Sequence, residues 1–187
     1  MELQSIFRRR LDAHIAAVNE MHNIIPEIFE SIVSVISCLD AGGKILICGN
    51  GGSAADAQHI AAEFVVKFSK RRIALPAIAL TVDSSVLLAA GNDFDFSHVF
   101  SRQVEALGNN GDLLIAISTS GQSANVNLAI EVALQKNMSV IVLTGQRCNV
   151  FVDGVFYLVF PHHETSIVQE MHQIYYHLLC EAVDDIS

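Results

Sequence analysis

Four short apolar runs, rich in β-branched and aliphatic residues, constrain the fold of this chain more than any other feature. The runs occupy residues 44–48, 77–80, 113–117 and 139–143. Continuous apolar runs of this length are typical of strands buried on both faces of a parallel sheet. Helical patterns lie between them, near residues 54–68, 84–107 and 124–137, and a fifth short strand is predicted near residues 155–159. The alternation predicts an α/β protein, a three-layer αβα sandwich with a five-stranded parallel sheet.

Helices are also predicted at both ends of the chain. Apolar residues at three- and four-residue spacing predict one helix over residues 3–18 and a second that Pro26 opens and the pair Gly42-Gly43 closes. A last helix is predicted over residues 164–182. With 187 residues, no repeat and no linker, the chain is predicted to form a single domain over residues 1–187, with residues 1–40 as a helical extension.

The charge and the cysteines limit the classes of partner and compartment. The formal net charge of -9 has the wrong sign for a protein that binds nucleic acid or an anionic membrane. The four cysteines form no CxxC pair and lie mostly in or beside apolar stretches, which is typical of buried thiols in a reducing compartment. No secretory signal and no apolar run near the roughly 20 residues of a membrane helix is found. We therefore expect a cytoplasmic protein.

Two loops follow strands at the edge of the sheet where ligands of parallel sheets bind. The first, Gly49-Asn50-Gly51-Gly52-Ser53, lets the backbone turn sharply and presents N–H groups at the start of a helix, which is the geometry of an anion site. It lacks the spacing of dinucleotide folds and the Gly-Lys-Ser/Thr of a P-loop. A plain tight turn with Ser53 as the helix N-cap explains the same residues equally well.

The second loop carries four hydroxyl groups around one glycine. Its residues are Ser118, Thr119, Ser120, Gly121, Gln122 and Ser123. Hydroxyls and helix N-terminal amides can hold a phosphate without Lys or Arg. One such residue is usually only a helix cap, but four together beside a glycine-serine loop favour a phosphate site.

Both loops resemble those of the sugar isomerase (SIS) domain family, whose members bind phosphosugars. The blocks GNGGSAADAQHIAAEF (49–64), AGNDF (90–94), FSRQVEALG (100–108), ISTSGQSANV (117–126) and QEMH (169–172) are similar, in this order, to its sedoheptulose 7-phosphate isomerases. The resemblance implies the SIS fold and these substrate-binding residues: Asn50, Gly51, Gly52, Ser53, Glu63, Asn92, Asp93, Ser118, Thr119, Ser120, Ser123 and Gln169. Spacing alone would make Asp93 an ordinary turn residue.

A metal site is also implied by the resemblance. His59 and Glu63 stand at i and i+4 of a helix, a spacing that suits a metal but more often marks an exposed polar pair. The family's zinc ligands correspond to His59, Glu63, Gln169 and His177, with one Zn²⁺ per subunit. Eight helical residues rise roughly 12 Å, so Gln169 and His177 of one chain cannot both reach one ion unless the helix start is irregular.

We therefore favour a site shared between two chains. The family is tetrameric, with sites between subunits, and the N-terminal helices of residues 1–40 are expected to pack the subunits together. Gln173, one turn before His177, is an alternative metal neighbour, whereas His172 is expected to be a satisfied core or interface histidine.

The implied reaction converts sedoheptulose 7-phosphate to D-glycero-D-manno-heptose 7-phosphate through an enediol, as the first step of nucleotide-activated heptose synthesis for surface glycans such as lipopolysaccharide. Glu63 and His177 are the expected proton-transfer pair, and zinc would act as a Lewis acid. Two departures from the family concern substrate contacts: Lys67 replaces a frequent Arg, and residues 164–168 lack the usual Asp or Arg.

Two other functions remain open from the sequence. One is a non-catalytic member of the family that binds the bacterial replication initiator protein, although that relative lacks the Glu and His that correspond to Glu63 and His177. The other is an isomerase of a different phosphosugar, since the fold is shared by enzymes of several substrates. A sugar-sensing regulator would usually carry a DNA-binding domain. The motifs indicate no such domain, and the acidic net charge argues against one.

Overall fold

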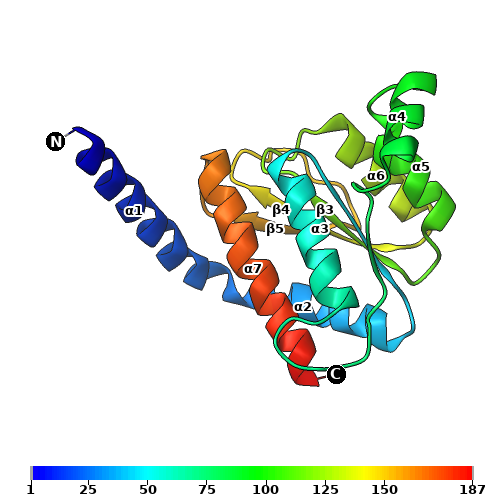
Figure 1. Ribbon diagram of the computed structural model, residues 1–187, viewed down its shortest axis with the longest axis horizontal. Helices are drawn as coiled ribbons and strands as arrows, with labels where there is room; N and C mark the ends of the chain where they lie inside the picture. The colour runs from blue at the N-terminus through cyan, green and yellow to red at the C-terminus, as the bar shows by residue number, and fades with distance from the viewer. Residues whose placement is uncertain (1, 187) are drawn as a thin grey trace.

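The computed structural model describes residues 2–186 and contains a five-stranded sheet in which all neighbouring strands are parallel (Figure 1). The strands are β1 (Ile45–Gly49), β2 (Ala77–Ala79), β3 (Leu113–Ile117), β4 (Ser139–Gly145) and β5 (Phe156–Phe160). Their order across the sheet is β2-β1-β3-β4-β5. Every residue of β1 and β3 is buried, as the continuous apolar runs predict, whereas the edge strands β2 and β5 are partly exposed.

Helices cover both faces of the sheet. They are α1 (Glu2–Glu20), the 3₁₀ turn η1 (Met21–Ile24), α2 (Ile25–Asp40), α3 (Gly52–Val65), α4 (Ser84–Asp93), α5 (His98–Leu107), α6 (Ala124–Gln135) and α7 (Thr165–Ile186). One hydrophobic cluster joins α2, α3 and α7 to one face of the sheet, and a second joins α4, α5 and α6 to the other. The predicted three-layer αβα sandwich is therefore confirmed.

The segment of residues 84–107 is two helices rather than the single stretch predicted. Asp83 caps α4, because its side chain accepts a hydrogen bond from Val86 N at 3.0 Å. The break before α5 is held by Asp95, whose carboxylate accepts from Ser97 N at 2.7 Å. This local bond gives the backbone an alternative to the helical hydrogen bond, which is how Asp and Ser interrupt helices.

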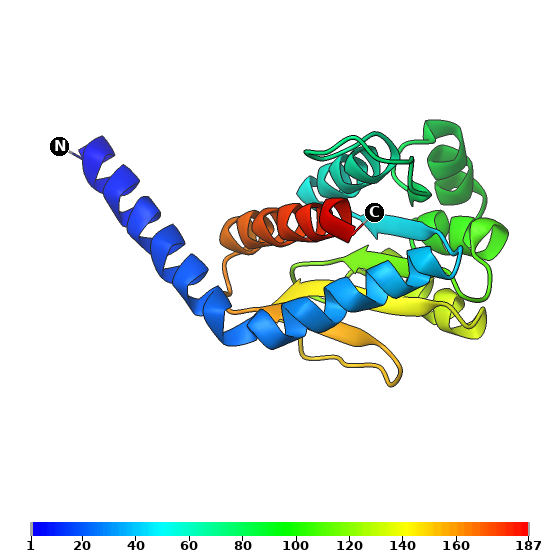
Figure 2. The ribbon, with the colours of Figure 1, turned by 90° about the horizontal axis from the view of Figure 1, so that it is seen from below.

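The two N-terminal helices have different environments. Helix α1 extends away from the body of the molecule, whereas α2 runs along the sheet (Figure 2). Val35 and Cys38 of α2 are buried in the core, while Leu3, Phe7 and Leu11 of α1 are more than 60% exposed. By length and composition alone, the helical segment Glu2–Asp40 could cross a membrane, although the sequence analysis predicted no membrane helix. The α2 half of this segment serves as a core helix of the domain.

The strand order reverses at the centre of the sheet. From β1 the chain passes to β2 on one side through α3, and β3 is paired on the other side of β1 and followed by α6. Helices α3 and α6 lie on opposite faces, so the loops that precede them separate at the carboxyl end of the sheet. This topological switch point is where ligands bind in open parallel sheets.

Candidate functional site

The glycine-rich loop turns at Gly51, which has a positive φ of 56° and is the N-cap of α3. Such a backbone angle favours glycine because it carries no Cβ. Ser53 lies inside the helix, is buried and makes no capping hydrogen bond, so the alternative interpretation of Ser53 as the N-cap is wrong. The N–H groups of Ser53, Ala54 and Ala55 already donate to the carbonyl oxygens of Asn50 and Gly51, so Gly52 carries the α3 amide that is left for a ligand at the switch point.

The serine loop leaves the sheet beside the glycine loop. Gly49 pairs with Ile117 in the parallel register, so Asn50 and Ser118 emerge at the same level. Ser123 is the N-cap of α6 but makes no capping bond, and its hydroxyl instead accepts from Ser118 Oγ at 3.2 Å. Since these hydroxyls are not used to cap the helix, they can turn to a ligand oxygen.

A pair of amide side chains joins the two loops. Asn50 Nδ2 donates to Asn125 Oδ1 at 2.8 Å, and Asn125 Nδ2 donates back to Asn50 Oδ1 at 2.8 Å. Asn125 is 3% exposed and Asn50 is partly exposed, so the buried side of the pair is that of Asn125. The sequence analysis included Asn125 in a similar block but assigned it no role. The structure gives it one, because it fixes the predicted substrate residue Asn50 against α6.

A cluster of titratable side chains lies between α3 and α7. His59 Nε2 is 3.1 Å from Glu63 Oε1, and the ring centroids of His59 and His177 are 5.2 Å apart. Phe68 stacks on His177 at 5.5 Å. Burial and then the nearby His59 lower the pKa of His177, which favours a neutral imidazole that can accept a proton. The structure thus places Glu63 and His177, the predicted proton-transfer pair, in one cluster.

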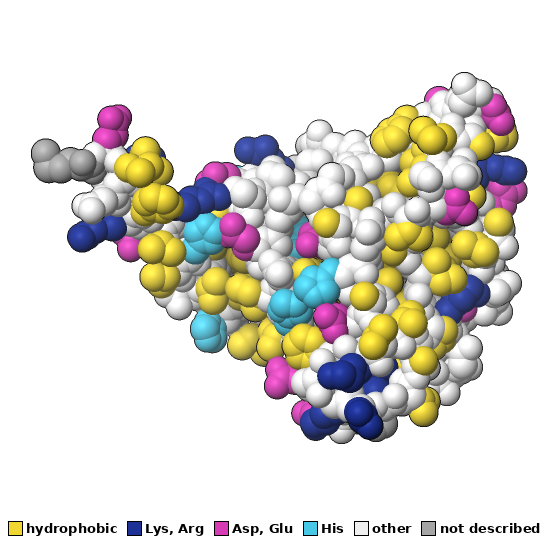
Figure 3. Space-filling view, in the orientation of Figure 1, with side chains coloured by type: hydrophobic (Ala, Val, Ile, Leu, Met, Phe, Trp, Pro, Cys, Tyr) yellow, Lys and Arg dark blue, Asp and Glu magenta, His cyan; other side chains and the backbone are white. Residues whose placement is uncertain are grey.

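This cluster is open at the surface. The side chains of His59 and Glu63 are 39% and 22% exposed. Figure 3 shows histidines next to an acidic side chain in the middle of this face, with basic side chains gathered further down the same view. Lys67, Lys70 and Arg71, just beyond α3, are exposed. Lys67, the predicted departure from the family pattern, therefore presents its charge to solvent in a single chain.

Gln169 is placed at the other end of the same helix pair. A Cβ built on Gly52 would lie 2.6 Å from Gln169 Nε2, so Gln169 lies over the first turn of α3 while His177 lies near His59. Helix α7 is continuous from Thr165, which removes the alternative of an irregular start. Within residues 2–186, no three His, Cys, Asp or Glu side chains are grouped closely enough to hold a metal.

Asn92 and Asp93 end α4, away from the α3–α7 cluster. Asn92 Nδ2 donates to Asp93 Oδ1 at 2.8 Å, and both residues are exposed. Their assignment to the substrate site stays a prediction. Residues 164–168 are the second departure from the family pattern. Glu164 forms an ion pair with Arg10 of α1 at 2.5 Å and so connects the start of α7 to the N-terminal helix.

A buried ion pair that the sequence analysis missed supports the end of α3. Arg72 Nε donates to Asp184 Oδ1 at 2.8 Å, and the two side chains are 2% and 0% exposed. Arg72 also donates to the carbonyl oxygens of Glu63 and Phe64, both at 2.8 Å. The guanidinium thus fixes the last turn of α3, which carries Glu63. No local pattern signals this contact, because 112 residues separate the partners.

His172 is fully buried in the core and lies edge-on to Phe160. Burial lowers its pKa to about 3, so the ring stays neutral. The predicted core position is confirmed, but the ring is not satisfied: neither nitrogen has a well-formed hydrogen bond in the described part of the chain. The four cysteines are all free and buried, as predicted, and burial raises the pKa of Cys48 to about 12.

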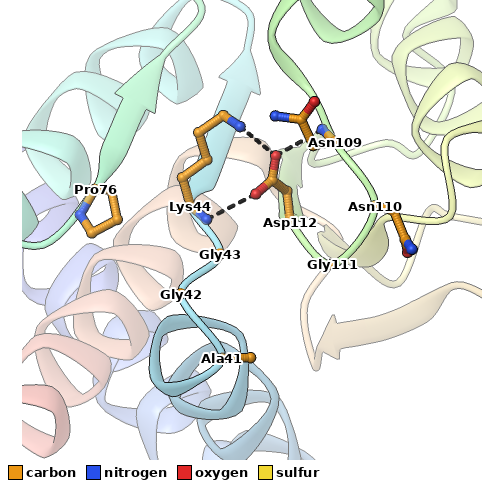
Figure 4. Close-up of a pocket in the computed structure, with 9 residues that line it drawn as sticks. All are labelled: Ala41, Gly42, Gly43, Lys44, Pro76, Asn109, Asn110, Gly111 and Asp112. Carbon is orange, nitrogen blue, oxygen red and sulfur yellow. Dashed lines mark hydrogen bonds and ion pairs between the residues drawn. The ribbon is translucent and has the colours of Figure 1, made fainter.

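A cavity of about 380 Å³ lies beyond the amino ends of strands β1 and β3, at the opposite end of the strands from the two ligand loops (Figure 4). Asp112 fills its wall, accepting hydrogen bonds from Lys44 N at 3.0 Å, Lys44 Nζ at 2.5 Å and Asn109 N at 2.7 Å. Ligands of parallel sheets bind at the carboxyl ends of the strands, so we assign this cavity a structural role. The hydrogen bonds of Asp112 join the segments that lead into β1 and β3.

Comparison with known proteins agrees with this architecture. Residues 11–145 match the model of the SIS domain family. A phosphoheptose isomerase of Methylibium petroleiphilum is 44% identical over 188 residues, which cover 96% of this chain and 94% of that protein.

Solved structures agree over nearly the whole chain. The phosphoheptose isomerase of Neisseria gonorrhoeae has a TM-score of 0.92 and 42% identity, and covers 98% of this chain and 100% of its own. That of Francisella tularensis has a TM-score of 0.93 and 37% identity, with 99% of both chains covered. This chain therefore belongs to the phosphoheptose isomerases of the SIS domain family.

Proposed function

We propose that this chain isomerises D-sedoheptulose 7-phosphate to D-glycero-D-manno-heptose 7-phosphate through an enediol. The observation that carries the proposal is the cluster of Glu63, His59 and His177 on the same helix that the glycine loop begins. The helix rises about 16 Å from Gly52 to Glu63, so in the proposed oligomer the loops of one subunit and the cluster of another would share one phosphosugar. Relatives named phosphoheptose isomerase extend over nearly all of this chain.

The phosphate is the part of the substrate that the two loops hold. The backbone amide of Gly52 and the hydroxyls of Ser53, Ser118, Ser120 and Ser123 supply hydrogen-bond donors without a fixed positive charge. Asn50 contributes an amide that Asn125 holds in place. Gln169, Asn92 and Asp93 are proposed to contact the sugar hydroxyls, and the latter two reach the site from another subunit.

Proton transfer is assigned to Glu63 and His177. A ketose-to-aldose shift removes a proton from carbon 1 and delivers one to carbon 2, while a proton also moves between the two oxygens. Glu63 is proposed as the carbon base and His177 as the group that serves the oxygens. Arg72 supports this step indirectly, because it holds the carbonyl of Glu63 at 2.8 Å and so limits the freedom of that helical turn.

The donor set fits a zinc ion. His59 Nε2 and Glu63 Oε1 are 3.1 Å apart, close to the separation of about 3.4 Å expected for two ligands of tetrahedral zinc. The described residues of one chain group no three His, Cys, Asp or Glu side chains closely enough to hold a metal, and Gln169 lies over Gly52 in its own chain. We therefore propose that His59, Glu63 and His177 would hold the metal only in the assembled oligomer, where a second subunit contributes Gln169. When bound, zinc would supply Lewis-acid stabilisation of the enediolate charge.

A homotetramer with sites between subunits is part of this proposal. Helix α1 exposes an apolar stripe that a monomer would leave in water: Leu3, Ile6, Phe7, Leu11, Ile15 and Val18. An unpartnered stripe of this size is typical of a helix that packs against other chains. The four free buried cysteines agree with a reducing, cytoplasmic location. The product would feed nucleotide-activated heptose synthesis for surface glycans such as lipopolysaccharide.

The decisive experiment follows turnover of sedoheptulose 7-phosphate by NMR, with zinc-loaded wild type, Glu63→Gln and His177→Gln. We expect aldoheptose 7-phosphate from the wild type and a loss of at least 100-fold in kcat for each variant, with sugar-phosphate binding retained. Glu131→Gln, on helix α6, is the matched control and should retain full activity. Binding without turnover by the wild type would favour a non-catalytic member of the family. Turnover of only a pentose or hexose phosphate would favour a different isomerase.

A further inference from the structure

Tyr176 lies between His59 and the carboxylate of Asp56. Its hydroxyl donates to Asp56 Oδ1 at 3.4 Å and lies 3.1 Å from His59 Nδ1. Tyr176 is 1% exposed, and the second oxygen of Asp56 is buried with no hydrogen-bond partner in the described part of the chain. Asp56 and His59 lie three residues apart on one face of α3, and α7 supplies the hydroxyl between them.

The chemistry of the acceptor assigns a direction to these hydrogen bonds. An ionised carboxylate can only accept, so we assign the single proton of the Tyr176 hydroxyl to Asp56. The Tyr176 oxygen can then only accept from His59, so Nδ1 carries the imidazole proton. In the neutral imidazole, Nε2 is then left with its lone pair, 3.1 Å from Glu63 Oε1. Two acceptors at this distance repel each other unless a cation lies between them.

We propose that Asp56 and Tyr176 form a positioning relay that holds His59 in the Nδ1–H tautomer and thereby makes the His59–Glu63 pair selective for a divalent cation. Without the relay, the Nε2–H tautomer would donate to Glu63 and form the common exposed polar pair at this spacing. Second-sphere carboxylates and hydroxyls orient metal-binding histidines in this way. The inference rests on the proposed zinc site, since the relay acts only through His59.

Two ring contacts hold the inner side of the His59 imidazole, while 39% of its side chain is exposed. Its edge meets the ring of Tyr176 at 5.2 Å and the ring of His177 at 5.2 Å, while Tyr176 and His177 are themselves edge-to-face at 4.9 Å. Rotation of the imidazole would disturb both contacts. Packing therefore sets the position of the ring, and the hydroxyl of Tyr176 sets its tautomer.

Zinc affinity of the full chain tests the relay, measured by competition with a chromophoric chelator. The variants are Tyr176→Phe, Asp56→Asn and the double variant. Tyr175→Phe is the matched control, because Tyr175 is equally buried on α7 but bonds to Ser31 at 3.0 Å, away from His59. We expect Tyr176→Phe to weaken zinc binding 10- to 100-fold, and Tyr175→Phe less than threefold. The double variant should bind no more than threefold more weakly than Tyr176→Phe, because Asp56 acts through Tyr176.

Two results would overturn the relay: zinc affinity of Tyr176→Phe within threefold of that of Tyr175→Phe, or no zinc binding by the wild type. Turnover of sedoheptulose 7-phosphate by the same preparations tests the proposed isomerase activity separately from zinc binding. A wild type that binds zinc tightly and loses that affinity in Tyr176→Phe, but turns over no heptose phosphate, supports the relay and refutes the proposed function. At saturating zinc, Tyr176→Phe should recover most of the wild-type kcat.

Discussion

Replacing Arg72 by Met tests how the structure supports the last turn of α3. The substitution leaves Asp184 buried, with hydrogen bonds only from Ser69 and Lys70, and removes the donor to the Glu63 and Phe64 carbonyls. Removing one partner of a buried ion pair costs about 3–5 kcal/mol, because the remaining charge is uncompensated. We expect a loss of this size in the free energy of unfolding, measured by guanidinium titration at fixed protein concentration.

The control is Lys70→Met, at the neighbouring ion pair between Lys70 and Asp185. Both side chains of that pair are 59% exposed, so its loss should change the free energy of unfolding far less than the loss of the buried pair does. The reasoning is refuted if Arg72→Met is no more destabilising than Lys70→Met. A retained stability would mean that the buried carboxylate finds another partner or that the segment after α3 is not held by this pair.

The same pair predicts a pH dependence with a definite sign. Burial alone would raise the pKa of Asp184, but the backbone N–H groups of Lys70 and Ser69 and the Arg72 side chain lower it from 3.8 to about 2. The folded pKa is below the unfolded one, so the stabilisation is present above pH 3.8 and is lost as the pH falls through 2. It amounts to about 2 kcal/mol. Between pH 6 and pH 2, the wild type should lose about this much more stability than Asp184→Asn; parallel curves would contradict the assignment.

Three further predictions concern the site. Gly52→Ala should displace Gln169, because the new Cβ would lie 2.6 Å from Gln169 Nε2. We expect kcat/KM to fall at least 10-fold. Gly91→Ala is the control and should leave activity unchanged, because the nearest atom to its new Cβ would be 3.9 Å away. Asn125→Ala should raise KM for the sugar phosphate and cost about 1–3 kcal/mol of unfolding free energy by urea titration, since Asn50 loses both amide bonds. Removal of metal by a chelator should lower kcat, and added Zn²⁺ should restore it; equal turnover before and after would exclude the proposed zinc role.

The sheet could be predicted from the sequence because its central strands are buried on both faces. Residues 45–49 and 113–117 are fully buried, so nothing but apolar residues is tolerated there, and the pattern is visible without knowing the fold. The break between α4 and α5 could not be placed, since Asp95 ends the helical pattern through a side-chain bond to Ser97 rather than through Pro or Gly. Such a bond depends on a local competition that composition does not reveal.

The candidate site was predictable only in part. Glu63 and His59 are one turn apart on a helix, so their proximity follows from the sequence. The approach of His177 was implied by family resemblance alone, and the partners Asp184 and Tyr176 were not predicted at all. These contacts join residues more than 100 positions apart. They depend on how α7 packs against α3, which no periodicity specifies.

The most direct test of the central claim is isomerisation of sedoheptulose 7-phosphate by the wild-type protein in D₂O, with NMR of the product. Proton transfer through an enediol by Glu63 predicts aldoheptose 7-phosphate with deuterium at carbon 2, and loss of both turnover and exchange in Glu63→Gln. Turnover and deuterium incorporation that persist in Glu63→Gln would contradict the assignment of the proton transfer to Glu63. No turnover of bound substrate would contradict the enzyme itself.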